Sequence, residues 1–228
     1  MTPFPRPTTG FRLFCLPNAG GGTVDFRRWS LPDTDVLPAC LPGRETRLHE
    51  RPYRSMPPLV EDLADALPTD RPYAMYGHSM GSWLAFELVR ELRRRGHRLP
   101  THLWVGARHA PHLPTSTPPL GRLPQAAFLE GMQARYGAIP DVLLGDPELL
   151  KTFLPALRGD VVLLDDYRYA EEAPLDVPIT VFRGADDPTV SEAEARAWEA
   201  HTTGPFALHT VPGGHFFHRE PDFPARLT

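Results

Sequence analysis

Hydrophobic residues along the chain form short apolar runs that alternate with segments of helical periodicity. The apolar runs predict strands at residues 11–16, 35–41, 73–76, 102–106, 177–182 and 206–211. Apolar residues at helical spacing predict helices at residues 58–67, from about residue 80 to residue 96, at 157–169 and at 192–200. Because strands and helices alternate, the pattern predicts an α/β fold with a mostly parallel central sheet and helices on both faces.

The alternation breaks between residues 113 and 155. Prolines are followed there by short apolar helical segments around Phe128 and Met132, and again around Phe153 and Leu154, and no strand is predicted. An insertion that is apolar on one face predicts a helical lid over the carboxyl ends of the strands, where open α/β sheets bind ligands. We expect these four residues to contact substrate. The alternative is a helical subdomain that is packed only for stability.

Composition restricts the class of protein. With 41% hydrophobic residues, 23% charged residues and a net charge of -4, the chain can build one sizeable core, so we expect a single domain over residues 1–228 and no nucleic-acid partner. No apolar run approaches the roughly 18 residues of a membrane span, and the N-terminus has no apolar signal-peptide core, so we expect no membrane contact and a cytoplasmic location. Cys15 and Cys40 are expected to be free buried thiols.

Four histidines cluster in the sequence and raise the question of a metal site. His97, His102, His109 and His112 match no ligand spacing, and no carboxylates or thiolates are interleaved with them. We therefore expect surface or loop histidines and no metal.

Residues 73–96 are typical of a strand, a sharp turn and a helix, with Ser79 at the apex of the turn. Residues 77–81 read Gly-His-Ser-Met-Gly, the Gly-x-Ser-x-Gly pattern of a nucleophile elbow. The pattern needs Gly77 and Gly81 because a Cβ at either position would collide with the neighbouring strand or helix. The helix that begins at about Met80 points unpaired N–H groups at the serine, where they can stabilise an oxyanion. The alternative is a glycine-rich turn without chemistry.

Two later loops contain the partners that such a serine needs. Asp186 and Asp187 follow the strand at 177–182, where a carboxylate can orient a histidine, and His215 lies on a glycine turn after the last strand. We prefer Asp187 and expect Asp186 to be a turn or N-cap residue. The order Ser79, Asp187, His215 is the order used by α/β-hydrolases, so the sequence predicts that fold with a Ser-His-Asp site.

In such a hydrolase, the loop after the first strand supplies a second oxyanion N–H. We assign this donor to Ala19, beside Met80, because residues 18–22 form a glycine-rich loop after the strand at 11–16. A phosphate-binding loop is the weaker interpretation, because no Lys-Ser/Thr follows and the G-x-G-x-x-G spacing is absent.

Several motifs together resemble one family over nearly the whole chain. They are LPNAGGG, LPGRETR, GHSMGSWLAFELVRELRRRG, GARHAPH, FLPALRGDVVLLDDYRY, GADDP and GGHFF. The sequence closely resembles the type II thioesterases, free-standing editing enzymes of polyketide and nonribosomal peptide assembly lines. The resemblance implies hydrolysis of acyl thioesters on the phosphopantetheine arm of acyl or peptidyl carrier proteins. Ser79 would be the nucleophile, His215 the general base and Asp187 its orienting acid.

The resemblance also implies a transient carrier partner, a monomer, and no cofactor beyond the phosphopantetheine that the partner carries. Two features depart from the family. Asn18 stands where histidine is common in the family. Only residues 216–228 follow His215, a shorter segment than we expect for the closing helix of this fold.

Three further interpretations remain open. The arginines of the helix after Ser79 could meet an acidic carrier protein, although a solvated helix face is the default; they are Arg90, Arg93, Arg94, Arg95 and Arg98. The same triad could serve a carboxylesterase, lipase or acyltransferase that acts on small esters. A hydrolase-fold binding protein without turnover is the third interpretation.

Overall fold

The computed structural model describes residues 2–8, 10–115, 117–137, 139, 142 and 145–227. Within them lies a six-stranded parallel sheet of order β2-β1-β3-β4-β5-β6. The strands are β1 (Phe11–Leu16), β2 (Thr34–Pro38), β3 (Tyr73–His78), β4 (Leu103–Gly106), β5 (Ile179–Gly184) and β6 (Phe206–Val211). Every predicted strand is confirmed, with small shifts of the ends. For example, β5 begins after Pro178, because proline has no N–H to donate to the ladder.

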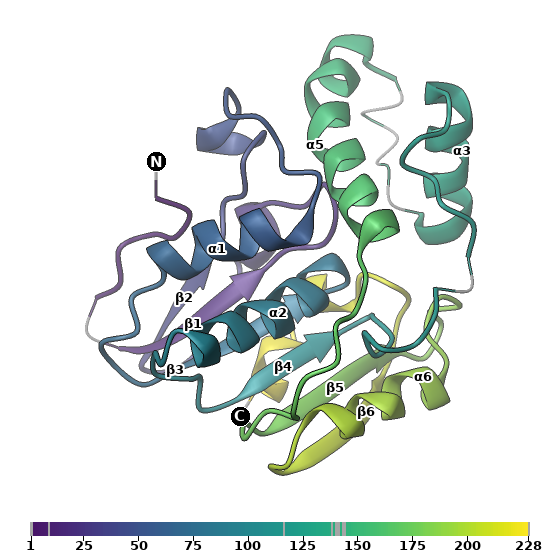
Figure 1. Ribbon diagram of the computed structural model, residues 1–228. Coiled ribbons are helices and arrows are strands. Elements are labelled where there is room, and N and C mark those ends of the chain that lie inside the picture. Colours follow the sequence, from purple (N-terminus) through teal and green to yellow (C-terminus); the bar gives the residue numbers. More distant parts are fainter. Residues whose placement is uncertain are drawn as a thin grey trace.

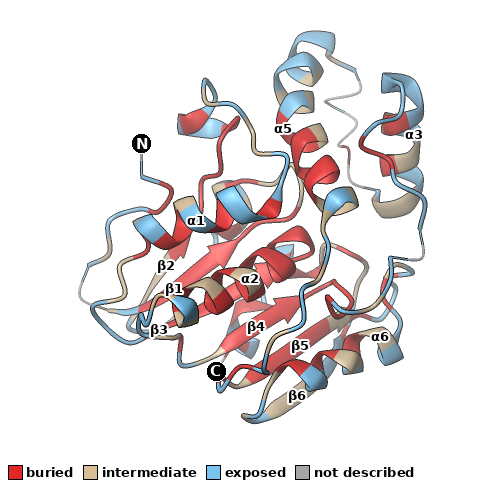
Figure 2. Cartoon of the chain, in the orientation of Figure 1, coloured by how far each residue is buried: buried red, intermediate tan, exposed pale blue. Residues whose placement is uncertain are grey.

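Residues of each central strand alternate between two cores. In β1, Phe14 and Leu16 face the core under α1 (Met56–Ala66) and α2 (Met80–Arg94), whereas Leu13 and Cys15 face the opposite core. Figure 1 shows α1 and α2 lying together across one face of the sheet. The opposite core is closed by aromatic residues of short 3-10 turns and loops rather than by long helices; they are Phe26, Trp29, Phe217 and Phe223. Because both faces are covered, the central strands β1, β3, β4 and β5 are buried almost throughout, whereas the edge strands β2 and β6 are only partly buried (Figure 2).

The predicted lid contains two long helices, α3 (Gln125–Tyr136) and α5 (Pro147–Asp166), which stand beyond the carboxyl ends of the strands (Figure 1). An apolar cluster between them includes Phe128, Met132 and Leu157. The outer parts of both helices are exposed, in contrast to the sheet (Figure 2). Residues 116, 138, 140, 141, 143 and 144 of the predicted lid lie outside the described residues.

The predicted end of the lid at Pro155 is corrected by α5, which runs through this proline and includes most of the separate helix predicted at 157–169. A proline inside a helix costs roughly 3 kcal/mol. Burial of Ala156, Leu157 and Val161 after the proline, together with an N-cap in which Asp146 accepts two backbone N–H groups, offsets this cost. The sequence signal for a break was therefore overridden by tertiary packing.

The last helix is shorter than predicted. α6 (Glu192–Arg196) begins with a capping box formed by Ser191 and Glu194 and continues as a 3-10 turn to His201. Cys15 and Cys40 are buried free thiols, as predicted. Within the described ranges, no helix has the length and apolar character needed to cross a membrane.

Candidate active site

The elbow between β3 and α2 holds Ser79 in a backbone conformation that non-glycine residues rarely adopt. Its φ is 53° and its ψ is -110°. A Cβ on Gly77 would lie 2.1 Å from the carbonyl oxygen of Gly81, and a Cβ on Gly81 would lie 2.1 Å from the carbonyl oxygen of Leu16 in β1. The predicted steric reason for both glycines is therefore confirmed. Strain of this kind persists only where surrounding structure enforces it.

Ser82 supplies part of that enforcement. Its buried hydroxyl lies 2.9 Å from the carbonyl oxygen of Gly77 and 2.8 Å from that of Gly106, and it accepts the Gly106 N–H at 3.0 Å. The Ser79 N–H donates to the same Gly106 carbonyl at 2.7 Å. One side chain of α2 thus joins β3 to β4 directly beneath the elbow.

The structure brings the three predicted triad residues together from widely separated loops. His215 Nε2 lies 2.9 Å from Ser79 Oγ, and His215 Nδ1 lies 2.8 Å from Asp187 Oδ2. Asp187 is buried, whereas Asp186 is exposed and uses its backbone N–H to bind the Gly213 carbonyl. The geometry therefore places Asp187, and not Asp186, against the histidine.

Thr189 is a contact that the sequence did not reveal. Its N–H and hydroxyl donate to Asp187 Oδ1 at 2.9 and 2.7 Å, and its hydroxyl lies 3.1 Å from His215 Nδ1. Burial alone would raise the pKa of Asp187, but the hydrogen bonds from His215 and Thr189 outweigh burial and hold this pKa below its usual range. The carboxylate is therefore ionised and fixed at neutral pH.

His78, the residue before the serine, holds the backbone of the histidine loop. Its Nε2 lies 2.7 Å from the His215 carbonyl oxygen and its Nδ1 lies 2.8 Å from the Tyr76 hydroxyl. Because a carbonyl only accepts, Nε2 must donate and Nδ1 must accept. Burial lowers the pKa of His78 well below its usual value, so the ring is neutral, as this tautomer requires.

The backbone N–H groups of Ala19 and Met80 bind no acceptor among the residues that the structure describes. Met80 is the first residue of α2, and Ala19 follows β1 at the neighbouring strand end. Both residues border the same edge of the sheet as Ser79. Two unpaired donors beside a serine hydroxyl are the requirement for an oxyanion hole.

A buried ion pair fixes the loop that contains Ala19. The Gly20 N–H donates to Asp160 Oδ2 at 2.8 Å, and Arg44 donates to Asp160 Oδ1 at 2.9 Å and to the Gly21 carbonyl at 2.7 Å. Arg44 and Asp160 are both buried. Since Asp160 belongs to α5, this clamp ties the lid to the proposed oxyanion loop.

Asn18, where the resembled family commonly has histidine, also shapes this loop. Its side-chain Nδ2 donates to the Ala19 carbonyl at 3.0 Å, and its backbone carbonyl accepts the Gly21 N–H at 2.9 Å. The departure from the family thus leaves the Ala19 N–H unobstructed.

A cavity of about 40 Å³ lies between Ser79, His215 and the lid. The Tyr136 ring, at the end of α3, lies 5.0 Å from the His215 ring. Met132, one of the four lid residues expected to contact substrate, borders this cavity.

The other three lid residues lie elsewhere. Phe128 is fully buried between α3 and α5, and Phe153 and Leu154 pack against the same apolar cluster rather than against the cavity. The sequence could not show whether a helix turns these apolar side chains toward its neighbour or toward the serine.

The walls of the cavity include charged residues that sequence reasoning passed over. Arg108 and Arg135 line it together with Asp165. Arg108 belongs to the GARHAPH segment, which was noted only as part of the family resemblance. Its position directly after β4, at the same sheet edge as Ser79, was the available signal.

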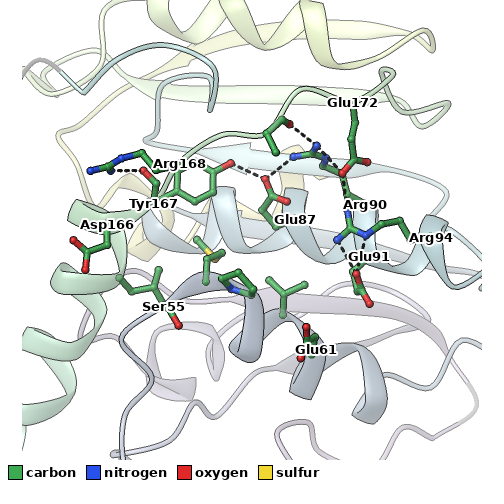
Figure 3. Close-up of a pocket in the computed structure, with 15 residues that line it drawn as sticks. Ser55, Glu61, Glu87, Arg90, Glu91, Arg94, Asp166, Tyr167, Arg168 and Glu172 are labelled. Carbon is green, nitrogen blue, oxygen red and sulfur yellow. Dashed lines mark hydrogen bonds and ion pairs between the residues drawn. The ribbon is translucent and has the colours of Figure 1, made fainter.

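A larger pocket of about 360 Å³ lies away from the serine, between α1, α2 and the segment after α5 (Figure 3). Two of the five arginines that could meet a carrier protein, Arg90 and Arg94, line this pocket. Arg90 is buried and pairs with Glu87 and Glu172, and Arg94 pairs with Glu91 and Glu172. These arginines therefore join elements of the chain and are not a free cationic face.

The clustered histidines are separated in the structure. His97 and His112 are exposed, and His109 lies in the loop after β4, where burial lowers its pKa to about 4. Within the described part of the chain, no group of three or more His, Cys, Asp or Glu side chains has a geometry that could hold a metal ion.

Fold and site together define the class of the protein. The sheet is parallel, and the serine lies on a strand-to-helix elbow. A hydrogen bond joins the serine to the histidine, and a second one joins the histidine to the aspartate. This is the arrangement of the α/β-hydrolases. The sequence matches the thioesterase domain family over residues 11–227. The chain therefore belongs to the thioesterase family.

Individual proteins support the same conclusion. The chain is 37% identical over 211 residues to gramicidin S biosynthesis protein GrsT of Aneurinibacillus migulanus, covering 90% of this chain and 82% of that protein. Its structure is similar to that of the RedJ thioesterase from the prodiginine pathway of Streptomyces coelicolor, with a TM-score of 0.87, 36% identity and coverage of 98% and 90% of the two chains. The type II thioesterase BorB from the borrelidin biosynthetic cluster gives a TM-score of 0.86 and 36% identity, covering 100% and 95%. The resemblance to type II thioesterases is confirmed.

Proposed function

We propose that the protein hydrolyses acyl thioesters held on the phosphopantetheine arm of acyl or peptidyl carrier proteins, through a covalent acyl-serine intermediate. The hydrogen bond of 2.9 Å between His215 Nε2 and Ser79 Oγ is the observation that carries this proposal. It joins a weak nucleophile to the base that can remove its proton, and Asp187 holds that base through Nδ1.

The reaction follows from these contacts. His215 takes the proton of Ser79 as the serine oxygen attacks the thioester carbonyl, and the N–H groups of Ala19 and Met80 receive the negative charge that forms on the carbonyl oxygen. Return of the proton to sulfur releases the thiol. Water then attacks the acyl-serine in the same way, and the carboxylic acid leaves. Every proton-transfer and charge-stabilising group in this sequence belongs to the chain, so the chemistry calls for no separate cofactor.

Support for a carrier-bound substrate comes from the relatives. BorB is a type II thioesterase of a biosynthetic cluster and RedJ a thioesterase of the prodiginine pathway, and similarity to both extends over nearly the whole chain. The proposal extends to removal of stalled or wrongly primed acyl groups in polyketide or nonribosomal peptide synthesis. It includes a transient contact with the carrier, a monomeric state and a cytoplasmic location.

The test is intact-mass spectrometry of carrier proteins loaded with different acyl groups, before and after incubation with the protein. We expect loss of the acyl mass with wild type and none with Ser79→Ala. A simple oxygen ester of the same acyl group is the matched substrate. Faster hydrolysis of the oxygen ester than of the carrier thioester would instead favour a small-ester carboxylesterase, and transfer of the acyl group to an added alcohol would favour an acyltransferase.

A further inference from the structure

Among the buried arginines of the described chain, Arg108 is the exception. The other four each form an ion pair with a carboxylate: Arg12 with Asp70, Arg44 with Asp160, Arg47 with Glu50 and Arg90 with Glu87. Arg108 is 7% exposed and has no carboxylate within ion-pair distance among the described residues.

Its surroundings do not replace a counter-ion. The guanidinium carbon lies 3.7 Å from the centre of the Trp83 ring, and Nε has no hydrogen-bond partner. Asp165, the acid on the same cavity wall, uses Oδ2 to accept the N–H groups of Leu120 and Gly121 at 3.1 and 2.7 Å. The Tyr136 hydroxyl lies near enough to interact with the guanidinium, but it is neutral and supplies no counter-charge. Stacking on tryptophan leaves the edge of the guanidinium, where its donors lie, facing away from the ring.

Burial lowers the pKa of Arg108, the charge of Arg135 acts in the same direction, and the interactions with Tyr136 and Asp165 oppose both. An arginine nevertheless stays protonated in a protein, so the group is a buried cation. A buried charge without a partner is costly, and such groups concentrate at functional sites.

Arg108 lies in the wall of the cavity that adjoins the serine. It lines the cavity that contains Ser79 and His215, and also an adjoining cavity of about 30 Å³. Thr115, Thr117 and Asp165 line both the first cavity and a groove of about 530 Å³ beyond it. A group that enters along this groove reaches Arg108 beside the serine.

We propose that Arg108 binds an anionic oxygen group of the thioester substrate. Planar guanidinium matches carboxylate and phosphate oxygens through paired hydrogen bonds. The anion has two possible sources on a carrier-bound substrate: a carboxylate at the end of a short acyl group, or the phosphate of the arm. The inference rests on the proposed function, because that function defines the carrier-bound thioester as the substrate.

The test is a set of four small thioesters that separates the two sources. Propionyl and malonyl groups are each attached to pantetheine and to phosphopantetheine, and kcat/KM is measured for wild type and Arg108→Gln. If Arg108 forms a charge-assisted hydrogen bond to the anion, kcat/KM of Arg108→Gln should fall roughly 10- to 100-fold, and only for the two substrates that contain that anion. Loss with both malonyl substrates assigns the anion to the acyl carboxylate, and loss with both phosphopantetheine substrates assigns it to the phosphate.

An equal loss with all four substrates, or no loss with any, overturns the inference, because Arg108 would then only support the cavity or do nothing. Wild type that hydrolyses none of the four overturns the proposed function, and the inference falls with it. Arg108→Lys keeps the charge but not the paired donors, so we expect a smaller loss of kcat/KM with the same two substrates. If Arg108→Gln does not fold, the lysine variant decides the question. The control is Arg122→Gln, which removes an exposed arginine that is paired with Asp166. This variant should leave kcat/KM unchanged for all four thioesters.

Discussion

The two ends of helix α2 differ in how their polar groups are satisfied. At its N-terminal end, Ser79 is held at a positive φ and the Met80 N–H has no acceptor among the described residues. At the C-terminal end, about 22 Å away along a helix of 15 residues, the arginines are matched by carboxylates of α2 itself and of the segment after α5 (Figure 3). Arginines near a helix C-terminus also suit its dipole.

This difference separates reactivity from stability within one element. Groups that keep an unused donor or a strained backbone can bind and react, at a cost to the fold. Groups that already have partners hold the chain together and have little left to offer a ligand. Substitutions at the N-terminal end should therefore change turnover far more than stability, and substitutions at the C-terminal end should do the reverse.

Ser79→Ala should produce the largest effect. Removal of a nucleophilic serine typically lowers kcat on the order of 10⁶-fold. We expect no detectable acyl-enzyme by intact mass and no labelling by a fluorophosphonate, with a melting temperature close to that of wild type. Residual turnover above about one-thousandth of wild type would show that the elbow serine is not the nucleophile.

Asp187→Asn should be next in size, with a loss of about 10⁴-fold in kcat, because an amide at this place favours the wrong tautomer of the histidine. Asp186→Asn, at the adjacent exposed position, is the matched control and should retain wild-type kcat. Steady-state rates of both variants on one thioester decide the assignment. The reverse pattern would move the orienting role to Asp186.

The N-terminal end of α2 was predictable from the sequence because the residues that determine its structure are close together in the chain or on adjacent strands. Gly77 and Gly81 are required by steric contacts within a few residues or with the adjacent strand. The order of Ser79, Asp187 and His215 along the chain matched the order in α/β-hydrolases. The partners of the arginines were not predictable in the same way. Arg93 pairs with Glu172, which lies 79 residues further along the chain, so only the folded arrangement reveals the match. Likewise, Pro155 signals a break that distant packing overrides.

Asp160→Ala tests whether the lid controls the oxyanion loop. The variant removes the acceptor of the Gly20 N–H and leaves Arg44 buried without its partner. If the Ala19 N–H is thereby displaced, kcat should fall roughly 10²-fold, the usual loss for one oxyanion donor, while KM changes little. Measured kcat and KM separate this effect from a defect in binding.

A double-mutant cycle with Ala19→Pro shows whether the two residues act through the same donor. Proline has no N–H, so the effect of Asp160→Ala should largely disappear in the Ala19→Pro background. Fully additive losses in kcat would mean that the clamp affects turnover by a route other than the Ala19 N–H. Asp160→Asn, which keeps an acceptor oxygen, should recover part of the activity.

Stability should depend on pH through a buried histidine beneath the site. Burial lowers the pKa of His218 to about 4, and its Nε2 lies 3.8 Å from the Asp25 carboxylate, too far for a hydrogen bond. The unfolded chain, with a histidine pKa near 6.5, binds more protons between these two values, so stability is full above about pH 6.5 and is lost as the pH falls. At pH 5 this histidine should cost about 2 kcal/mol.

His218→Phe keeps a ring to stack on His78, whose ring centre lies 3.6 Å away, and removes the titration. In urea unfolding, the loss of stability from pH 7 to pH 5 should be about 2 kcal/mol smaller in the variant than in wild type. An identical pH dependence in both proteins would show that His218 does not resist protonation in the folded state.

Charge reversal at the far end of α2 should have the smallest effect on catalysis. In the Arg93→Glu/Arg94→Glu double variant, glutamates replace partners of Glu172 and Glu91, and half-exposed pairs of this kind are worth about 1 kcal/mol or less each. We expect a modest fall in the free energy of unfolding and a change of less than about twofold in kcat/KM for an acyl-carrier substrate, because these arginines are already paired. A much larger fall in kcat/KM for the carrier substrate, with turnover of a small free thioester unchanged, would mean that the carrier competes successfully for these arginines. In that case the distinction between a reactive end and a structural end of α2 would no longer hold.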